Sequence, residues 1–226
     1  MTLAAVEAVR SAQIVAYPVA RRGATSMAAT IAERWIRDDH QRLPLVFPMV
    51  ADAKARQQAW HAAAETLLLE VRRGAAVALL CEGDASLFAT TSYVLLAIQG
   101  LDLSCPLTVI PGVSSVSAAA AAGQWPLALQ QDQLLLRPCP DSTEALDAEL
   151  QQAARSRRVL ALFKLGHRWG WVRGCLEHHG LLSQALFAER VGWPDQLVCS
   201  ADQVEASERP YFSMLLIRQG WPDTLP

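Results

Sequence analysis

A glycine stands between two carboxylates at Glu82, Gly83 and Asp84, directly after a continuously apolar segment at residues 75–80. That segment is too short for a typical helix, so it predicts a strand covered on both faces. In parallel α/β sheets, ligands bind beyond the carboxyl ends of the strands. Gly83 lets a backbone approach a ligand closely, whereas Asp84 could either bond to ligand donors or cap and orient the turn. Spacing alone leaves both roles of Asp84 open.

A second turn carries two hydroxyl groups. Pro111 and Gly112 end another apolar segment, residues 107–110, and Ser114 and Ser115 precede an alanine-rich stretch. Taken alone, this is the pattern of an ordinary helix N-cap. The chain has neither the G-x-G-x-x-G pattern nor the G-x-x-x-x-G-K-[ST] pattern, so ordinary dinucleotide and phosphate-loop binding are disfavoured.

The segments that must position these turns alternate between helix and strand, which indicates an α/β fold with a mostly parallel sheet in the first half. Gly74, Gly100 and several prolines mark the ends of segments. The predicted helices are residues 4–13, 25–37, 51–73, 92–98, 117–122, 142–154 and 171–178. The predicted strands are residues 14–18, 45–47, 75–80, 107–110, 134–136, 159–163, 185–188 and 212–217.

Nothing between the two halves resembles a flexible linker. We therefore expect two α/β domains, residues 1–110 and 111–226, joined by a tight hinge at Pro111 and Gly112, with the active site in the cleft between them.

Composition narrows the possible functions. The 226 residues are 52% hydrophobic, which is enough to bury a substantial core, and the formal net charge of -2 gives no reason to expect nucleic acid as a partner. Without a leader-like start or an apolar run long enough to span a bilayer, the sequence predicts a cytoplasmic protein with no membrane partner. The five cysteines are scattered and never form C-x-x-C, so we expect no metal site and no disulfide framework.

Several motifs occur together in a fixed order. LCEGD at residues 80–84 is followed by FATTSY at residues 88–93 and by IPGVSS at residues 110–115. In this order they resemble the tetrapyrrole (corrin and porphyrin) methylases, S-adenosylmethionine-dependent enzymes with two α/β domains. Further stretches resemble the branch of that family that methylates C20 of precorrin-2: FPM at residues 47–49, Trp60, QWPL at residues 124–127, FKLG at residues 163–166 and PYFS at residues 210–213.

The resemblance implies that S-adenosylmethionine is the cofactor and that its contacts are largely made by the backbone. It also implies a homodimer acting on precorrin-2 or on its cobalt-loaded counterpart. The residues that match the family's cofactor site are Glu82, Gly83, Asp84 and Leu87 on one side, Ser114 and Ser115 on the other, and Lys164 and Gly192 in the second domain. Because a sulfonium methyl is already activated, no catalytic residue is assigned.

The chain departs from the family pattern in two places. Ala85 stands where the family usually has a proline, which makes the turn less rigid. The stretch that begins at Met1 matches the part of the pattern that follows the family's first strand and its glycine- and proline-rich loop, so we expect either a start further upstream or a domain without that strand. If the first loop is missing, the alternative is a truncated, inactive cofactor-binding protein. A separate alternative is a related methylase that acts on uroporphyrinogen III or on ribosomal RNA.

Overall fold

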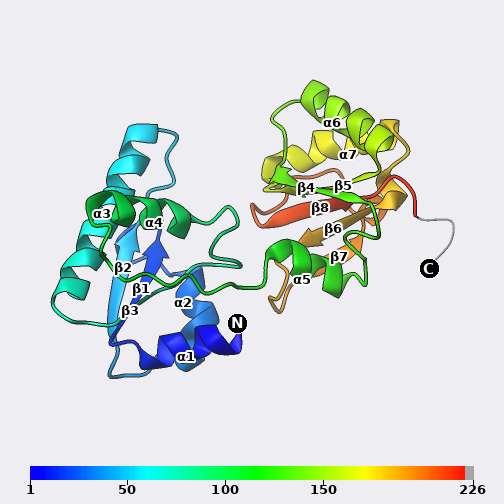
Figure 1. Ribbon diagram of the computed structural model, residues 1–226. Coiled ribbons are helices and arrows are strands. Elements are labelled where there is room, and N and C mark those ends of the chain that lie inside the picture. The colour runs from blue at the N-terminus through cyan, green and yellow to red at the C-terminus, as the bar shows by residue number, and fades with distance from the viewer. Residues whose placement is uncertain (222–226) are drawn as a thin grey trace. The chain divides into compact units, whose positions relative to one another are not determined.

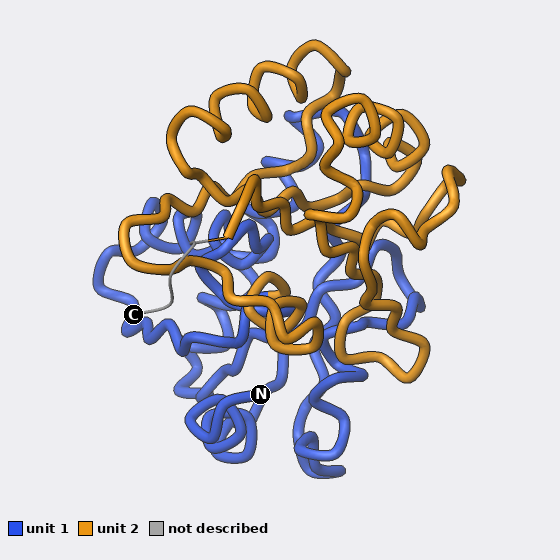
Figure 2. The backbone as a smooth tube through the Cα atoms, turned by 90° about the vertical axis from the view of Figure 1, so that its right-hand side faces the viewer, with its two compact units in different colours: residues 1–114 blue, residues 115–226 orange. Residues whose placement is uncertain are grey.

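The computed structural model describes residues 1–221, and the chain divides into two compact units, Met1–Ser114 and Ser115–Pro226 (Figure 2). Each unit has its own β-sheet with helices packed against it (Figure 1). The predicted α/β class with two α/β parts is confirmed. The division keeps Pro111 and Gly112 with unit 1, while the expected domain boundary after residue 110 stays a prediction.

The sheet of unit 1 has three parallel strands in the order β2-β1-β3. Its middle strand pairs with both neighbours, since Ala16 lies between Leu43 and Leu79 in the register. Parallel strands end at the same edge of a sheet, so the residues that follow all three strands gather there. The strands are β1 (Ile14–Val19), β2 (Gln41–Val46) and β3 (Val77–Leu79).

Helices cover both faces of this sheet because neighbouring residues of β1 point to opposite sides. Ala16 packs in a core cluster with residues of α3 and α4, and Val15 packs in another with residues of α1 and α2. Thr2, Ser26 and Asp52 cap three of these helices by accepting backbone N–H groups. The helices are α1 (Leu3–Ser11), α2 (Met27–Ala32), the 3-10 turn η1 (Glu33–Trp35), α3 (Ala53–Arg72) and α4 (Thr90–Leu101).

Several details of unit 1 differ from the prediction: β2 begins at Gln41 instead of residue 45, and the helix expected at residues 25–37 ends at Ala32 and is followed by η1. The strand expected at residues 75–80 is shortened to Val77–Leu79 and is only half-buried, because β3 is the edge of the sheet. Gly100 lies inside α4 instead of ending it. The strand expected at residues 107–110 is wrong: these residues join no ladder, and Leu107 and Val109 are 42% and 50% exposed. An apolar run becomes a strand only where a neighbour supplies hydrogen bonds, and no described strand does so here.

The sheet of unit 2 is mixed, with the order β4-β5-β8-β6-β7. β4 and β5 are parallel, and β8 lies antiparallel between β5 and β6, with every residue of β8 buried. The sequence did not predict β7, which is short and only half-buried. The strands are β4 (Gln133–Pro138), β5 (Arg158–Phe163), β6 (Ala185–Glu189), β7 (Leu197–Ser200) and β8 (Ser213–Ile217).

Helices also cover both faces of the second sheet (Figure 1). The small side chains of α5 pack against Ala161, Leu186 and Leu216 on one face, and α6 and α7 pack around the buried Trp169 and Phe187 on the other. The helices are α5 (Ser115–Ala122), α6 (Thr143–Ser156), α7 (Trp169–His178) and the 3-10 turns η2 (Gly166–Arg168), η3 (Leu182–Gln184) and η4 (Ala201–Gln203). Within residues 1–221, no helix combines the length and the hydropathy needed to cross a bilayer.

Candidate functional site

The two turns singled out in the sequence lie against each other in unit 1, although they are 28 residues apart. The backbone N–H of Gly112 donates to Oδ2 of Asp84 at 2.8 Å. A Cβ atom added at Gly112 would lie 2.0 Å from the carbonyl oxygen of Gly83, so only a residue without a side chain fits. The turn after β3 and the turn at residues 111–112 therefore form one structural unit.

The Asp84 carboxylate is the group that joins them. Its Oδ1 accepts the backbone N–H of Ser86 at 2.9 Å and also the Ser86 hydroxyl, while Oδ2 accepts Gly112. The Ser86 hydroxyl first, and then the N–H groups of Ser86 and Gly112, lower the pKa of Asp84 from its ordinary value. Of the two roles left open by the sequence, this geometry supports the orienting one, and a carboxylate has further lone pairs for a ligand donor.

The neighbours of Asp84 on the same turn are more open to solvent. Glu82 and Gly83 are exposed, and Gly83 has a φ of 69°, in the left-handed region. Leu87 is half-buried, and its N–H reaches the carbonyl of Asp84 at 3.4 Å. The turn thus presents main-chain groups and the exposed Glu82 carboxylate beside Asp84 at the carboxyl edge of the sheet.

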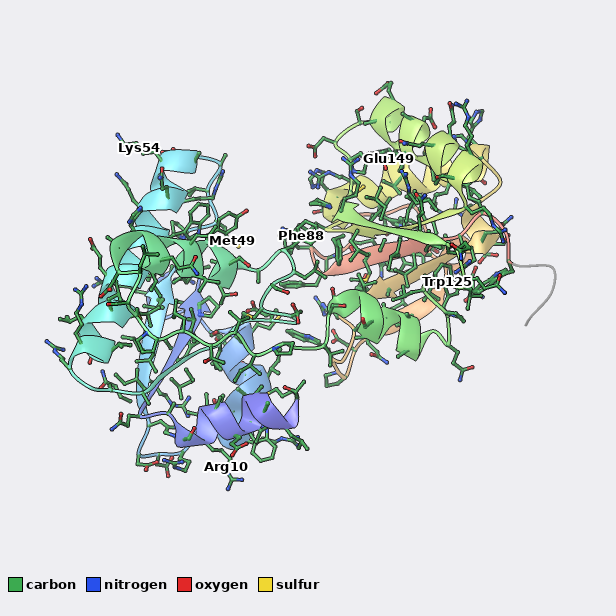
Figure 3. The ribbon with its side chains drawn as sticks, in the orientation of Figure 1. Arg10, Met49, Lys54, Phe88, Trp125 and Glu149 are labelled. Atoms are coloured by element: carbon green, nitrogen blue, oxygen red, sulfur yellow. The ribbon has the colours of Figure 1, made fainter. Side chains whose placement is uncertain are left out.

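The backbone conformation of Phe88 was not predicted from the sequence motif. Phe88 lies on the loop between β3 and α4 with a φ of 53° and is 51% exposed (Figure 3). A bulky residue rarely adopts left-handed backbone, and such positions cluster at functional sites. The loop therefore holds a strained aromatic residue four positions after Asp84.

Ala85, which replaces the family's usual proline, is fixed by two side chains instead of by a ring. The hydroxyl groups of Thr91 and Ser92 each donate to its carbonyl oxygen at 3.2 Å. Both hydroxyls come from the first turn of α4. The chain thus restrains the turn by hydrogen bonds where a proline would restrain it covalently.

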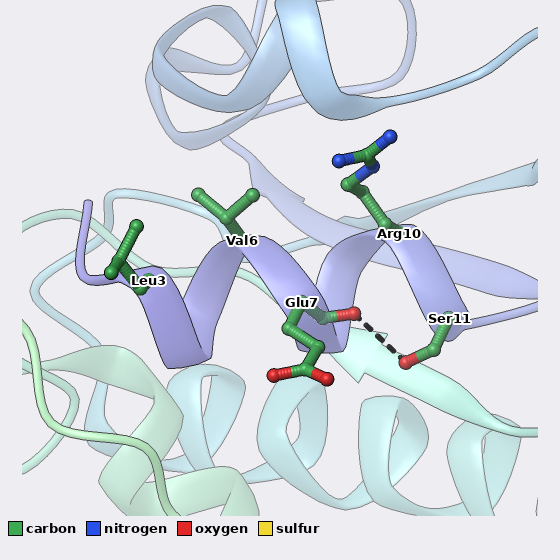
Figure 4. A pocket seen from close by; sticks show the side chains of 5 residues that line it. All are labelled: Leu3, Val6, Glu7, Arg10 and Ser11. Atoms are coloured by element: carbon green, nitrogen blue, oxygen red, sulfur yellow. Dashed lines mark hydrogen bonds between the residues drawn. The ribbon is translucent and has the colours of Figure 1, made fainter.

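Two of the hollows on unit 1 differ greatly in size. The one beside the turn is lined by Pro18, Phe47, Glu82 and Thr90, among others, and holds about 10 Å³, roughly the room for one water. The other holds about 490 Å³ and is lined by five residues of α1, Leu3, Val6, Glu7, Arg10 and Ser11 (Figure 4). None of these five is a predicted site residue, and Ser11 bonds to the backbone of its own helix. Neither hollow is therefore the predicted site, and binding at the exposed turn stays a prediction.

In unit 2, two of the three predicted site residues, Lys164 and Gly192, follow strands that end at the same sheet edge. β5 and β6 are both antiparallel to β8, so they run in the same direction. Lys164 follows β5 with a φ of 60°, and its Nζ lies 5.5 Å from the centre of the Tyr211 ring. Gly192 follows β6 with a φ of 87°, and its N–H donates to Gln196 at 2.8 Å.

A buried ion pair lies at the same edge and was missed by sequence reasoning. Glu189, at the end of β6, is 8% exposed. Its Oε2 accepts hydrogen bonds from Nε and Nη2 of Arg209 at 2.9 and 2.7 Å. A two-bond arginine–carboxylate pair fixes geometry as well as charge. Its partners are 20 residues apart in an irregular region, so no spacing rule could have found it.

The eight predicted cofactor residues divide between the two units. Glu82, Gly83, Asp84 and Leu87 lie on one turn of unit 1, with Ser114 at the end of that unit, whereas Ser115, Lys164 and Gly192 belong to unit 2. Ser115 is the first residue of α5. Contact between these residues and a cofactor stays a prediction.

The motif residues Trp60 and Tyr93 contact each other across α3 and α4. Their rings are stacked, with centroids 4.1 Å apart and planes 7° from parallel. Tyr93 is 49% exposed, so the pair forms an aromatic surface between the two helices.

Comparison with known proteins gives a consistent result. The family model of the tetrapyrrole (corrin/porphyrin) methylases matches residues 1–205. The cobalt-precorrin-2 C(20)-methyltransferase of Salmonella typhimurium is 30% identical over 98% of this chain and 91% of its own length. The precorrin-2 C(20)-methyltransferase of a Sinorhizobium species is 28% identical over 99% of this chain and 91% of its own.

A solved structure shares the fold. It is the uroporphyrin-III C-methyl transferase from Thermus thermophilus, complexed with S-adenyl homocysteine. The structural match includes 97% of this chain and 91% of that protein. The TM-score is 0.57 at 18% sequence identity. Since the family model matches residues 1–205 and a relative is 30% identical over 98% of the chain, the chain belongs to the tetrapyrrole methylases.

Proposed function

We propose that the protein transfers a methyl group from S-adenosylmethionine to C20 of precorrin-2, or of its cobalt-loaded form, in cobalamin biosynthesis. The observation that carries this proposal is the similarity over almost the whole chain to two methyltransferases named for that reaction. The branch motifs at Trp60 and at residues 210–213 support the same assignment.

The residues of the two turns fit the chemistry of the proposed cofactor. S-adenosylmethionine supplies a sulfonium-activated methyl group together with an ammonium and a carboxylate. The exposed Glu82 carboxylate and the open main chain at Gly83 suit cationic and hydrogen-bonding groups, and the hydroxyls of Ser114 and Ser115 suit an anionic one. The structural relative complexed with S-adenyl homocysteine supports this choice. Leu87, Lys164 and Gly192 complete the proposed set of contacts.

The contribution of the protein to such a reaction is mainly positioning. Holding two reactants in line can supply about 7–11 kcal/mol of the barrier, so no nucleophilic side chain is needed. Asp84 holds Gly112 against Gly83, and the Thr91 and Ser92 hydroxyls hold Ala85, so the turn is ordered by its own contacts. On the family resemblance, we propose that the active form is a cytoplasmic homodimer.

The test is methyl transfer by the purified chain. With S-adenosylmethionine and precorrin-2, we expect a product carrying one additional methyl group, located at C20 by nuclear magnetic resonance, and no such product from uroporphyrinogen III. Glu82→Gln should weaken cofactor binding in calorimetry, while Glu7→Gln on α1 should not. Methylation of uroporphyrinogen III instead would favour the other activity of the family, and cofactor uptake without any transfer would favour an inactive binding protein. Absence of cofactor uptake would refute both the proposed methyl transfer and the inactive binding protein.

A further inference from the structure

Three side chains with metal-binding atoms converge between two helices of unit 2. Cys175 and His179 are four residues apart at the end of α7, so they lie on the same side of that helix. Asp147 reaches them from α6, which packs beside α7 in the same core cluster. The Sγ, Nε2 and carboxylate oxygen atoms all lie within 4.8 Å of one another.

The distances suit a small tetrahedral centre. Oδ1 of Asp147 lies 3.1 Å from Sγ of Cys175 and 2.7 Å from Nε2 of His179. Around a zinc ion with bonds of about 2.0–2.3 Å, neighbouring ligand atoms are roughly 3.3–3.6 Å apart. Side-chain movements of about 1 Å therefore convert the hydrogen-bonded cluster into a coordination shell.

The surroundings favour a cation and leave it a way in. Cys175 is buried, whereas the side chains of His179 and Asp147 are 23% and 38% exposed, so the cluster opens to solvent on one side. The last carbonyl groups of α7 add negative potential at His179, which is the C-cap residue. Without a metal ion, the Cys175 thiol donates a hydrogen bond to Oδ1 of Asp147.

We propose that Asp147, Cys175 and His179 bind one Zn²⁺ ion in a site with three protein ligands and one water. One sulfur, one nitrogen and one oxygen form a donor set typical of zinc and unlike the all-oxygen shells of calcium and magnesium. On binding, Cys175 releases its thiol proton to solvent, and His179 coordinates through the Nε2 lone pair with its ring proton on Nδ1. No electron is transferred.

This site is separate from the proposed methyl-transfer residues, none of which belongs to the cluster. The ion would link α6 to α7 and so stabilise unit 2 by binding only the folded state. The scattered cysteines gave no sign of such a site, because only the packing of the two helices brings Asp147, 28 residues before Cys175, into the cluster.

The experiment uses the tag-free full chain, treated with a chelator and without any tetrapyrrole. Competition with a chromophoric chelator is expected to show one zinc ion bound per chain. Cobalt(II), used as a spectroscopic probe, is expected to give visible ligand-field bands and a near-ultraviolet thiolate-to-metal band. Uptake of less than one equivalent, or cobalt spectra without the thiolate band, would overturn the proposal.

Matched variants identify the ligands. Cys175→Ser should abolish the thiolate band, and His179→Gln should weaken zinc binding by at least about 10-fold, in the range known for altered metal sites. Cys199→Ser and His178→Gln are the controls, because Cys199 is another free cysteine and His178 is the adjacent histidine outside the cluster. If Cys175→Ser does not fold, the test is the difference in zinc affinity between His179→Gln and His178→Gln. Equal zinc affinities of these two variants would exclude the site.

Discussion

Replacing Gly112 by alanine tests the contact between the two turns. The new Cβ would lie 2.0 Å from the Gly83 oxygen, 3.0 Å from the Gly83 carbonyl carbon and 3.2 Å from Cα of Asp84. All three are backbone atoms, so no side chain can rotate away. Ordinary contact begins near 3.4 Å, so the turns must separate by more than about 1 Å and the bond from Gly112 to Asp84 must lengthen or break.

The size of the effect follows from these contacts. Losing a hydrogen bond to a charged group costs about 1.5–3 kcal/mol, and inserting a methyl group into a filled space costs about 1–3 kcal/mol. Moving the turns apart relieves the clash but breaks the hydrogen bond, so the two costs do not simply add. We therefore expect Gly112→Ala to lower the free energy of unfolding by about 2–4 kcal/mol and the melting temperature by roughly 5–15 °C. A displacement of about 1 Å in a positioning element also predicts a loss of roughly 100-fold in methyl transfer.

Gly100→Ala is the matched control. Gly100 lies inside α4, and a Cβ there meets no atom within 4 Å. Alanine is the better helix former by about 0.5–1 kcal/mol, so this variant should melt at the same temperature or higher. Melting is followed by circular dichroism and activity by mass spectrometry of the product. If Gly112→Ala matches Gly100→Ala in both measurements, the inferred contact between the turns is wrong.

Three further predictions concern other parts of the chain. Arg218→Ala should cost about 3–5 kcal/mol in urea unfolding, because it leaves the carboxylate of Asp132, only 4% exposed, without its charged partner. The hydrogen bond from Arg218 holds the pKa of Asp132 below its ordinary value. The stabilisation from this pair is therefore fully present above the unfolded pKa of about 3.9 and declines as the pH falls from there through the lower folded pKa. A wild-type advantage over Asp132→Asn that does not shrink as the pH falls below about 3.9 would contradict this. Phe88→Gly should relieve about 1–2 kcal/mol of left-handed backbone strain and raise the melting temperature while lowering methyl transfer, and a fall in both would mean that packing of Phe88 dominates. Trp60→Phe should retain about 0.5–1.5 kcal/mol of the stacking with Tyr93 that Trp60→Ala loses, and equal melting temperatures would refute a role for the stack.

The sequence predicted the elements whose signals are local. The long helix α3 was located within two residues at each end, and Gly74, at a φ of 88°, follows its end as expected, while the structure adds Asp52 as its N-cap. Prediction failed where the signal depends on neighbours. Residues 107–110 have the composition of a strand, yet no described strand pairs with them, whereas β7 is only four residues long but pairs with β6 along all four.

The candidate site shows the same limit. Motif order located Gly83 and Gly112. The hydrogen bond between Gly112 and Asp84 could not be predicted, because it forms only when the later turn packs against the turn after β3. The Asp147–His179 contact between α6 and α7 was likewise not predictable from the sequence. Contacts between elements distant in the chain depend on packing, which spacing rules do not encode.

The position of β8 has a consequence for synthesis of the protein on the ribosome. All strands of unit 1 precede residue 80, so that sheet can assemble early, whereas β8 occupies the middle of the second sheet and is made last. Until it emerges, β5 and β6 expose the unpaired edges that it will later occupy, and nascent chains with open edges are prone to aggregate. Chaperone dependence and sensitivity to stalled translation should therefore be concentrated in the C-terminal half.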